Sequence, residues 1–168
     1  MKLILFLLIL FTSACLDAQV QEYKDQYPNG KTRSEGNYVS GFEEGLWKYY
    51  YDTGTLQEES NYKKGKLNGS VKRYHANGQL MVDGYFRMNE QDSIQRTYSA
   101  EGKLVEEGYF TKGSKTGRWN YFFPTGDTLM VEEFRNGEEL LWVYCDANKL
   151  RTVSAGNGVM EEKLDNGK

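Results

Sequence analysis

Several residue types are scarce in this chain, and each scarcity argues against a kind of chemistry. His75 is the single histidine, so the chain offers no second histidine for a catalytic triad or a metal cluster. The glycine-rich stretch from Gly108 to Gly117 contains no Gly-Lys-Ser/Thr phosphate loop. Acids are plentiful, but no Asp/Glu pair stands out as a general acid and base. We therefore expect a protein that is not an enzyme and that holds no cofactor and no metal.

Charge of one sign and long apolar stretches are also lacking. The 21 basic residues are scattered among 24 acidic ones, and without a basic stripe nucleic-acid binding is not expected. The mean hydropathy of −0.72 is too low for a thick aliphatic core. The apolar material is largely aromatic, with 13 Tyr and 3 Trp, while Gly is abundant at 18. Tyrosine rings pack while their hydroxyls stay hydrated, which favours a thin, partly covered sheet.

The first residues read as an export signal. Lys2 precedes an uninterrupted apolar run, Leu3 to Phe11, which is too short to span a bilayer and has the length of a signal-peptide core. Two processing routes fit: cleavage after Ala18, or a lipobox-like Ser-Ala-Cys sequence that makes Cys15 a lipid-modified first residue. We expect a signal peptide at residues 1–18 and a repeat array at 19–168.

Both processing routes leave Cys145 as the only free thiol of the mature chain. A single thiol excludes an intramolecular disulfide framework, and a half-buried unpaired cysteine is favoured over a nucleophile. Membrane attachment is expected only through lipid on Cys15, because the mature chain has no basic amphipathic element.

Beyond the signal, the glycines recur at a period of 24 residues. The first column is Gly30, Gly54, Gly78, Gly102 and Gly126, and the second is Gly41, Gly65, Asn89, Gly113 and Gly137. A third column runs Gly45, Gly69, Ser93, Gly117 and Leu141. Such a fixed period is the signature of a tandem array.

Each 24-residue unit reads as two strands and two glycine turns, and the Asn-Gly pairs suit tight hairpins. No segment shows helical periodicity after the signal. We predict an all-β, open, elongated antiparallel meander of about five to six β-hairpin repeats. Irregular turns are expected in the third copy, where Asn89, Ser93 and Gln95 replace Gly, Gly and Trp, and after Gly137, where the unit contracts. The chain stops on a turn, at Asn166 to Lys168, which leaves either an open sheet edge or a charged terminus that protects itself.

Charged residues follow the same period. The acids Glu35, Glu59, Asp83 and Glu107 form one column, and the bases Lys48, Lys72 and Arg96 form another on the intervening strands. The acids would lie roughly 9.5 Å apart on one face, at twice the strand spacing. A cation site is conceivable, but cross-strand ion pairing is the favoured interpretation.

Aromatic residues of the return strands supply the candidate binding strip. Its members are Trp47, Tyr50, Tyr74, Tyr98, Trp119, Phe122 and the off-register Trp142. Tyr and Trp are enriched at interface hot spots, and such rings also stack on sugars. Alternatively, the rings simply cover the sheet's own inner face.

The unit resembles the bacterial variant of the MORN repeat. The residues that carry the resemblance are Gly54-Thr55-Leu56, Glu107 to Phe110, Lys112 to Trp119 and Gly41 to Trp47. The resemblance implies a succession of hairpins that acts as a scaffold or binding surface, and some bacterial members carry an antitoxin-like label. We expect an exported protein-interaction module in the periplasm or cell envelope, or secreted. The alternative is a module that binds glycan or cell wall through the ring strip.

Overall fold

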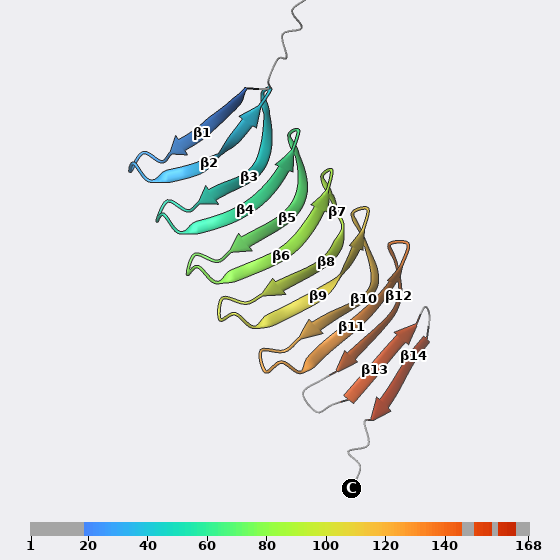
Figure 1. Cartoon of the computed structure of the whole chain (residues 1–168). Helices are drawn as coiled ribbons and strands as arrows, with labels where there is room; N and C mark the ends of the chain where they lie inside the picture. Colours follow the sequence, from blue (N-terminus) through green and yellow to red (C-terminus); the bar gives the residue numbers. More distant parts are fainter. Residues whose placement is uncertain (1–18, 146–149, 156–157, 164–168) are drawn as a thin grey trace, which may run out of the picture.

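A computed structural model describes residues 19–145, 150–155 and 158–163, and every regular element in these ranges is a β-strand. The strands form one antiparallel sheet, shown in Figure 1. Their bounds are β1 Val20–Gln26, β2 Thr32–Val39, β3 Phe42–Tyr50, β4 Leu56–Lys63, β5 Lys66–Tyr74, β6 Leu80–Arg87, β7 Glu90–Gln91, β8 Ser93–Tyr98, β9 Leu104–Thr111, β10 Ser114–Phe122, β11 Thr128–Arg135, β12 Glu138–Cys145, β13 Leu150–Ala155 and β14 Gly158–Lys163.

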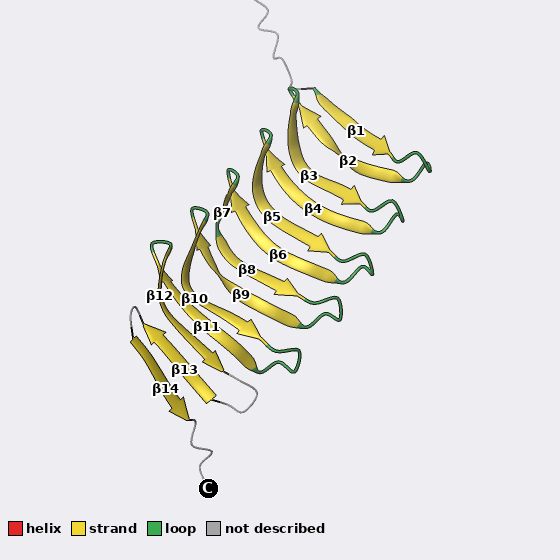
Figure 2. Cartoon of the chain, turned by 180° about the vertical axis from the view of Figure 1, so that it is seen from behind, coloured by secondary structure: helices red, strands yellow, loops and turns green. Residues whose placement is uncertain are grey.

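Strand order in the sheet follows the chain. β7 and β8 both pair with β6, and together they replace one return strand of the array. β1 and β14 are the two end strands, and the hairpins stack between them with their turns in two rows along the long edges (Figures 1 and 2). The predicted all-β open meander is confirmed.

One row of turns is built on the first glycine column. In each turn the glycine N–H donates to the carbonyl three residues earlier, as Gly54 does to Tyr51 at 2.8 Å, and the Tyr51 N–H donates to Thr55 at 2.9 Å. This is the three-residue hairpin loop, in which the last residue is left-handed. The five glycines, Gly30, Gly54, Gly78, Gly102 and Gly126, have φ between 77° and 93°. The period of 24 therefore marks a backbone requirement.

The opposite row consists of two-residue turns. Both central residues have positive φ, as at Lys64 (50°) and Gly65 (72°), which defines type I′ turns that match the twist of the strands. In the third copy Met88 and Asn89 take the same conformation, and Ser93 has a φ of 73° where other copies place glycine. The turn of the third copy is therefore regular, contrary to expectation, and the irregularity lies in its return strand, which Asp92 interrupts between β7 and β8.

The return strands β3, β5, β10 and β12 also carry a bulge. Between Glu35↔Lys48 and Asn37↔Glu44, three residues of β3 lie opposite one residue of β2. The same arrangement recurs between β9 and β10, whereas β12 has a single extra residue opposite β11. The contraction expected after Gly137 is thus a shortening of this bulge.

Successive residues of a strand point to opposite faces, so the sheet has two surfaces. We call the face that carries Lys48, Glu59 and Glu107 the ladder face, and the face that carries Trp47 and Trp119 the tryptophan face. Within the described residues, neither face is covered by a helix or a second sheet. The core is correspondingly thin and consists of residues on the tryptophan face: Trp47, Val71 and Trp119, with Ser60 fully buried between the first two.

Side chains also join one turn to the next. The hydroxyls of Tyr27 and Tyr51 donate to the carbonyls of Tyr50 and Tyr74, at 2.7 and 2.8 Å. His75 occupies the same column and donates from Nε2 to the Tyr98 carbonyl at 2.9 Å. The single histidine of the chain thus has a structural partner within the turn row.

Three expectations lie outside the described residues. They are the signal peptide, the processing at Cys15 or Ala18, and the final turn at residues 166–168.

Candidate binding surface

The two periodic tryptophans of the predicted strip are buried. Trp47 is 3% exposed and Trp119 is 1% exposed. Each indole lies over a glycine of the preceding forward strand, where a Cβ at Gly36 or Gly108 would overlap the ring. Each indole N–H donates to a backbone carbonyl, that of Asn37 at 3.2 Å or that of Tyr109 at 3.1 Å. Truncating either ring would remove core at a cost of about 3–5 kcal/mol, so it is not a clean test of ligand binding.

The structure does not assemble the predicted residues into one strip. Trp47 packs with Tyr38, Tyr49 and Tyr62 on the tryptophan face, with ring centroids 4.9 to 6.3 Å apart. Tyr50 lies three residues further along β3 and therefore points to the ladder face. The odd spacing between the two columns, combined with the alternation of side chains in a strand, separates them. Tyr74, Tyr98 and Phe122 share the column of Tyr50.

Trp142 is placed by the contraction of its unit. Glu132 pairs with both Trp119 and Trp142, just as Ser60 pairs with both Trp47 and Val71. The shortened bulge thus returns this off-period tryptophan to the backbone position that Val71 holds three repeats earlier. Its side chain lies outside the described residues.

A line of alternating charge runs across the ladder face. From β1 to β9 the residues that pair in register are Lys24, Glu35, Lys48, Glu59, Lys72, Asp83, Arg96 and Glu107. Ion pairs join Lys24 to Glu35 at 3.1 Å, Lys48 to Glu59 at 3.8 Å and Arg96 to Glu107 at 3.2 Å. The predicted cross-strand pairing is confirmed. In the described part of the chain, no group of three or more His, Cys, Asp or Glu residues is arranged to hold a metal ion.

Tyrosines next to this line hydrogen-bond to its acids. The Tyr50 hydroxyl donates to Glu35 at 2.7 Å, and the Tyr74 hydroxyl donates to Glu59 at 3.1 Å. Burial, with the hydrogen bond to Glu35, raises the pKa of Tyr50 to about 12. The bonds from Tyr50 and Lys24 hold the pKa of Glu35 below its usual range. These two rings are therefore anchored at their polar ends.

Exposed apolar side chains lie on the ladder face around β9, as Phe42 and Leu46 do near the start of the array. Along β9, Val105, Glu107 and Tyr109 share this face, and Val105 and Tyr109 are 38% and 52% exposed. Tyr85, 42% exposed, holds the Tyr109 position one repeat earlier, with Ile94 between them in the sheet. We call Tyr85, Ile94, Val105, Tyr109 and Phe122 the ladder-face patch.

A hollow borders the patch. Val105 and Phe122 help line a cavity of about 390 Å³ that reaches Phe123 and Pro124 in the turn row. Two members of the predicted strip, Tyr98 and Phe122, lie in the ladder-face column that runs beside this region.

Two periodic columns were missed from the sequence. The first is Tyr85 and Tyr109, although these residues are 24 positions apart. The second is a column of small residues with the same period: Gly36, Ser60, Gly84 and Gly108. Their small size leaves room for the large side chains of the neighbouring return strands on the tryptophan face.

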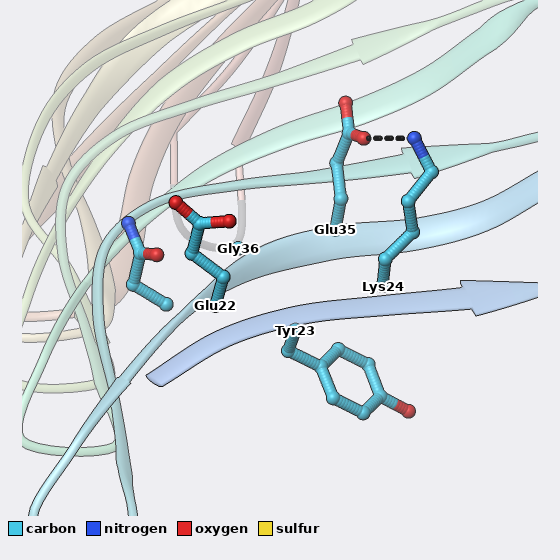
Figure 3. A pocket seen from close by; sticks show the side chains of 6 residues that line it. Glu22, Tyr23, Lys24, Glu35 and Gly36 are labelled. Atoms are coloured by element: carbon cyan, nitrogen blue, oxygen red, sulfur yellow. Dashed lines mark hydrogen bonds and ion pairs between the residues drawn. The ribbon is translucent and has the colours of Figure 1, made fainter. Parts of the chain in front are cut away.

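A second hollow lies at the first strands. It has a volume of about 500 Å³ and is lined by residues of β1 and β2, among them Glu22, Lys24 and Glu35 (Figure 3). In Figure 3 Glu22, Lys24 and Glu35 stand on one side of the strands and Tyr23 on the other.

These features define a class of protein: a single-layer, antiparallel β-repeat array with a turn glycine every 24 residues. The model of the MORN repeat variant matches the chain at residues 22–40, 43–64, 67–88 and 91–112, together about half of its length. The chain belongs to this family. Among the described residues, no helix has the length and apolarity to cross a membrane.

Solved structures show weaker likenesses. A chain of the Glycosylation Associate Protein (Gap123) complex from Streptococcus agalactiae is 23% identical, with a TM-score of 0.36, over 61% of this chain and 19% of that one. A chain of the GtfA/B complex is 13% identical, with a TM-score of 0.24, over 71% of this chain and 20% of that one. This chain thus spans about a fifth of the length of each. At these scores nothing about partners or activity follows. No curated protein matches the chain significantly.

Proposed function

We propose that this protein is a non-catalytic, exported interaction module that binds a partner protein through its ladder face. Membership of a repeat family supports the coarser statement, a repeat-based binding or scaffold module. Binding of a partner protein through the ladder face rests on the ladder-face patch, where exposed tyrosines and an aliphatic side chain flank the Arg96–Glu107 ion pair.

The patch has the composition of an interface centre. Protein interfaces combine aromatic anchors with a polar surround, and tyrosine is enriched among the residues that dominate binding. Tyr85 and Tyr109 lie on strands two apart, so their rings start roughly 9.5 Å from each other. That separation suits two neighbouring apolar side chains of a partner. The tryptophan face is a weaker candidate, because Trp47 and Trp119 are buried by the sheet itself.

The proposed location rests on the N-terminal sequence. The apolar run of residues 3–11 supports export to the periplasm, the envelope or the medium, and lipid on Cys15 would hold the module at a membrane. An antitoxin-like inhibitor would be a special case of such a module, although export argues against a cytoplasmic target.

The decisive experiment is capture with a matched set of variants. The tagged protein is cross-linked in envelope extract, and the Tyr85→Ala/Tyr109→Ala double variant is compared with Phe42→Ala, a comparably exposed aromatic on the same face but in another hairpin, outside the patch. One stoichiometric protein retained by wild type and Phe42→Ala, but reduced about tenfold or more with the double variant, supports the proposal.

A parallel pelleting assay with purified cell wall tests the alternative. Pelleting that depends on Tyr85 and Tyr109, without a captured protein, would replace the partner protein by a glycan. Capture that is indifferent to both tyrosines would overturn the ladder-face patch as the binding site.

A further inference from the structure

β1 is an edge strand whose outer backbone groups face no strand among the described residues. Its side chains repeat the pattern of the return strands: Tyr23 occupies the column of Trp47, and Lys24 begins the charge ladder. Every later return strand of the described array, except the terminal β14, has a neighbour on both sides. An exposed edge of this kind is a ready template for another strand.

When two copies of β1 lie antiparallel, the residues of one copy complement those that they face in the other. A pairing centred on Tyr23 sets Tyr23 opposite its own copy and Glu22 opposite Lys24 of the copy. Glu22 and Lys24 share the ladder face, while Tyr23 points to the opposite face (Figure 3). Opposite charges that face each other across strands are stabilising, whereas like charges are destabilising.

The charged groups have room for this pairing. Glu22 is exposed and makes no ion pair within the described residues. Lys24 bonds to Glu35 at 3.1 Å, but its side chain is 57% exposed, so a second carboxylate could reach it. On the other face, Tyr23 packs against Tyr38 and Trp47, with centroids 5.4 and 5.5 Å away, and remains 36% exposed. A second Tyr23 would cover its open side.

We propose that two copies of this protein join through β1, antiparallel and in the register centred on Tyr23, so that their sheets become continuous. This is an isologous, closed arrangement. The surface is distinct from the ladder-face patch, and the inference stands whatever partner that patch binds.

End-to-end stacking of β14 on β1 is the less suitable arrangement. Strands alternate in direction across the sheet, and the number of strand positions from β1 to β14 is odd, because β7 and β8 together occupy one position. The two end strands therefore point the same way. Translating one copy onto the next would create a parallel pair, which is slightly less stable per residue and foreign to this sheet.

Charge reversal tests the register. The protein, expressed from its full sequence, is measured by light scattering over a concentration series. We expect wild type to dimerise, and Glu22→Lys and Lys24→Glu each to weaken dimerisation about tenfold or more, since like charges then meet twice across the axis.

Mixing the two charge variants should restore a mixed dimer. One copy then presents lysine at both positions 22 and 24, and the other presents glutamate at both, so every facing pair is again of opposite charge. Glu101→Lys, the same charge change in a distant turn, should leave the dimer unchanged.

Cysteine cross-linking tests the same register independently of charge. In a Cys145→Ser background, Tyr23→Cys should form a disulfide between copies, because antiparallel partners lie about 4.5–5.5 Å apart at Cα, within the range a disulfide spans. Gln21→Cys should not, since it lies about 13 Å along the strand from its own copy. A protein that stays monomeric, a mixture that stays monomeric, or equal cross-linking at 21 and 23 would overturn the proposal.

Discussion

Single residues decide which rings of this protein are hidden. Trp47 and Trp119 are buried because Gly36 and Gly108 on the neighbouring strand leave room for an indole. In the second copy the larger Ser60 replaces this glycine, and the smaller Val71 replaces the tryptophan opposite it. The summed side-chain volume of the facing pair is thus balanced. Close packing of this kind gives a single-layer sheet a core.

The first prediction concerns this balance. Gly108→Ala should lower the free energy of unfolding by about 1–3 kcal/mol, since its Cβ would overlap the Trp119 ring. Urea denaturation provides the measurement. Trp119→Val alone should cost more, because it removes the buried ring, but Gly108→Ala should cost little when it is added to Trp119→Val, because no indole is then left to overlap.

Gly84→Ala is the matched control. Its Cβ would meet only the side-chain ends of Gln91 and Gln95, at 3.7 and 3.9 Å. The substitution should be neutral or stabilising by up to about 1 kcal/mol, because alanine loses less chain entropy on folding. Equal destabilisation at positions 84 and 108 would contradict the packing explanation.

At the scale of elements, two turn types alternate along the sheet. The three-residue turns require one left-handed residue, and the type I′ turns require two. Ser40, Lys64, Met88, Lys112 and Asn136 all accept positive φ at the first position of a type I′ turn. The turn conformation is imposed by the twist of the hairpin, at a local cost that the ladder hydrogen bonds offset.

The second prediction isolates this cost. Gly126 has a φ of 93°, and no atom lies within 4 Å of the point that a Cβ would occupy. Gly126→Ala should therefore lower stability by about 1–2 kcal/mol through backbone strain alone. Gly126→Asn should lose less, since asparagine tolerates the left-handed region better. Thermal unfolding of both variants tests this, and a larger loss for Asn than for Ala would contradict it.

At the scale of the whole molecule, the array is quasi-one-dimensional. The extensive contacts all join strands that are neighbours in the sheet. Stability in such arrays is a sum of unit and nearest-neighbour contributions. The two faces and the two end strands consequently offer separate surfaces for separate partners.

The third prediction follows from this linear arrangement. In Gly108→Ala, amide hydrogen exchange should accelerate about tenfold or more in β8 to β11, next to the disturbed pair, and stay near wild type in β1 to β3. Exchange measured by mass spectrometry resolves these segments. Uniform acceleration from β1 to β11 would show instead that the sheet opens as one unit.

Much of the architecture was determined by sequence alone, because the period of 24 is a local backbone requirement repeated along the chain. The turn glycines, the antiparallel order and the pairing of Lys48 with Glu59 all follow from that period and the spacing of strands. The tertiary structure decided what the period does not encode. It returned Trp142 to the position of Val71 by shortening one bulge.

The tertiary structure also left Tyr85 and Tyr109 exposed while it buried the periodic tryptophans. The face and burial of a side chain depend on bulges and on the volume of residues across the strand, which are properties of pairs of strands rather than of one segment.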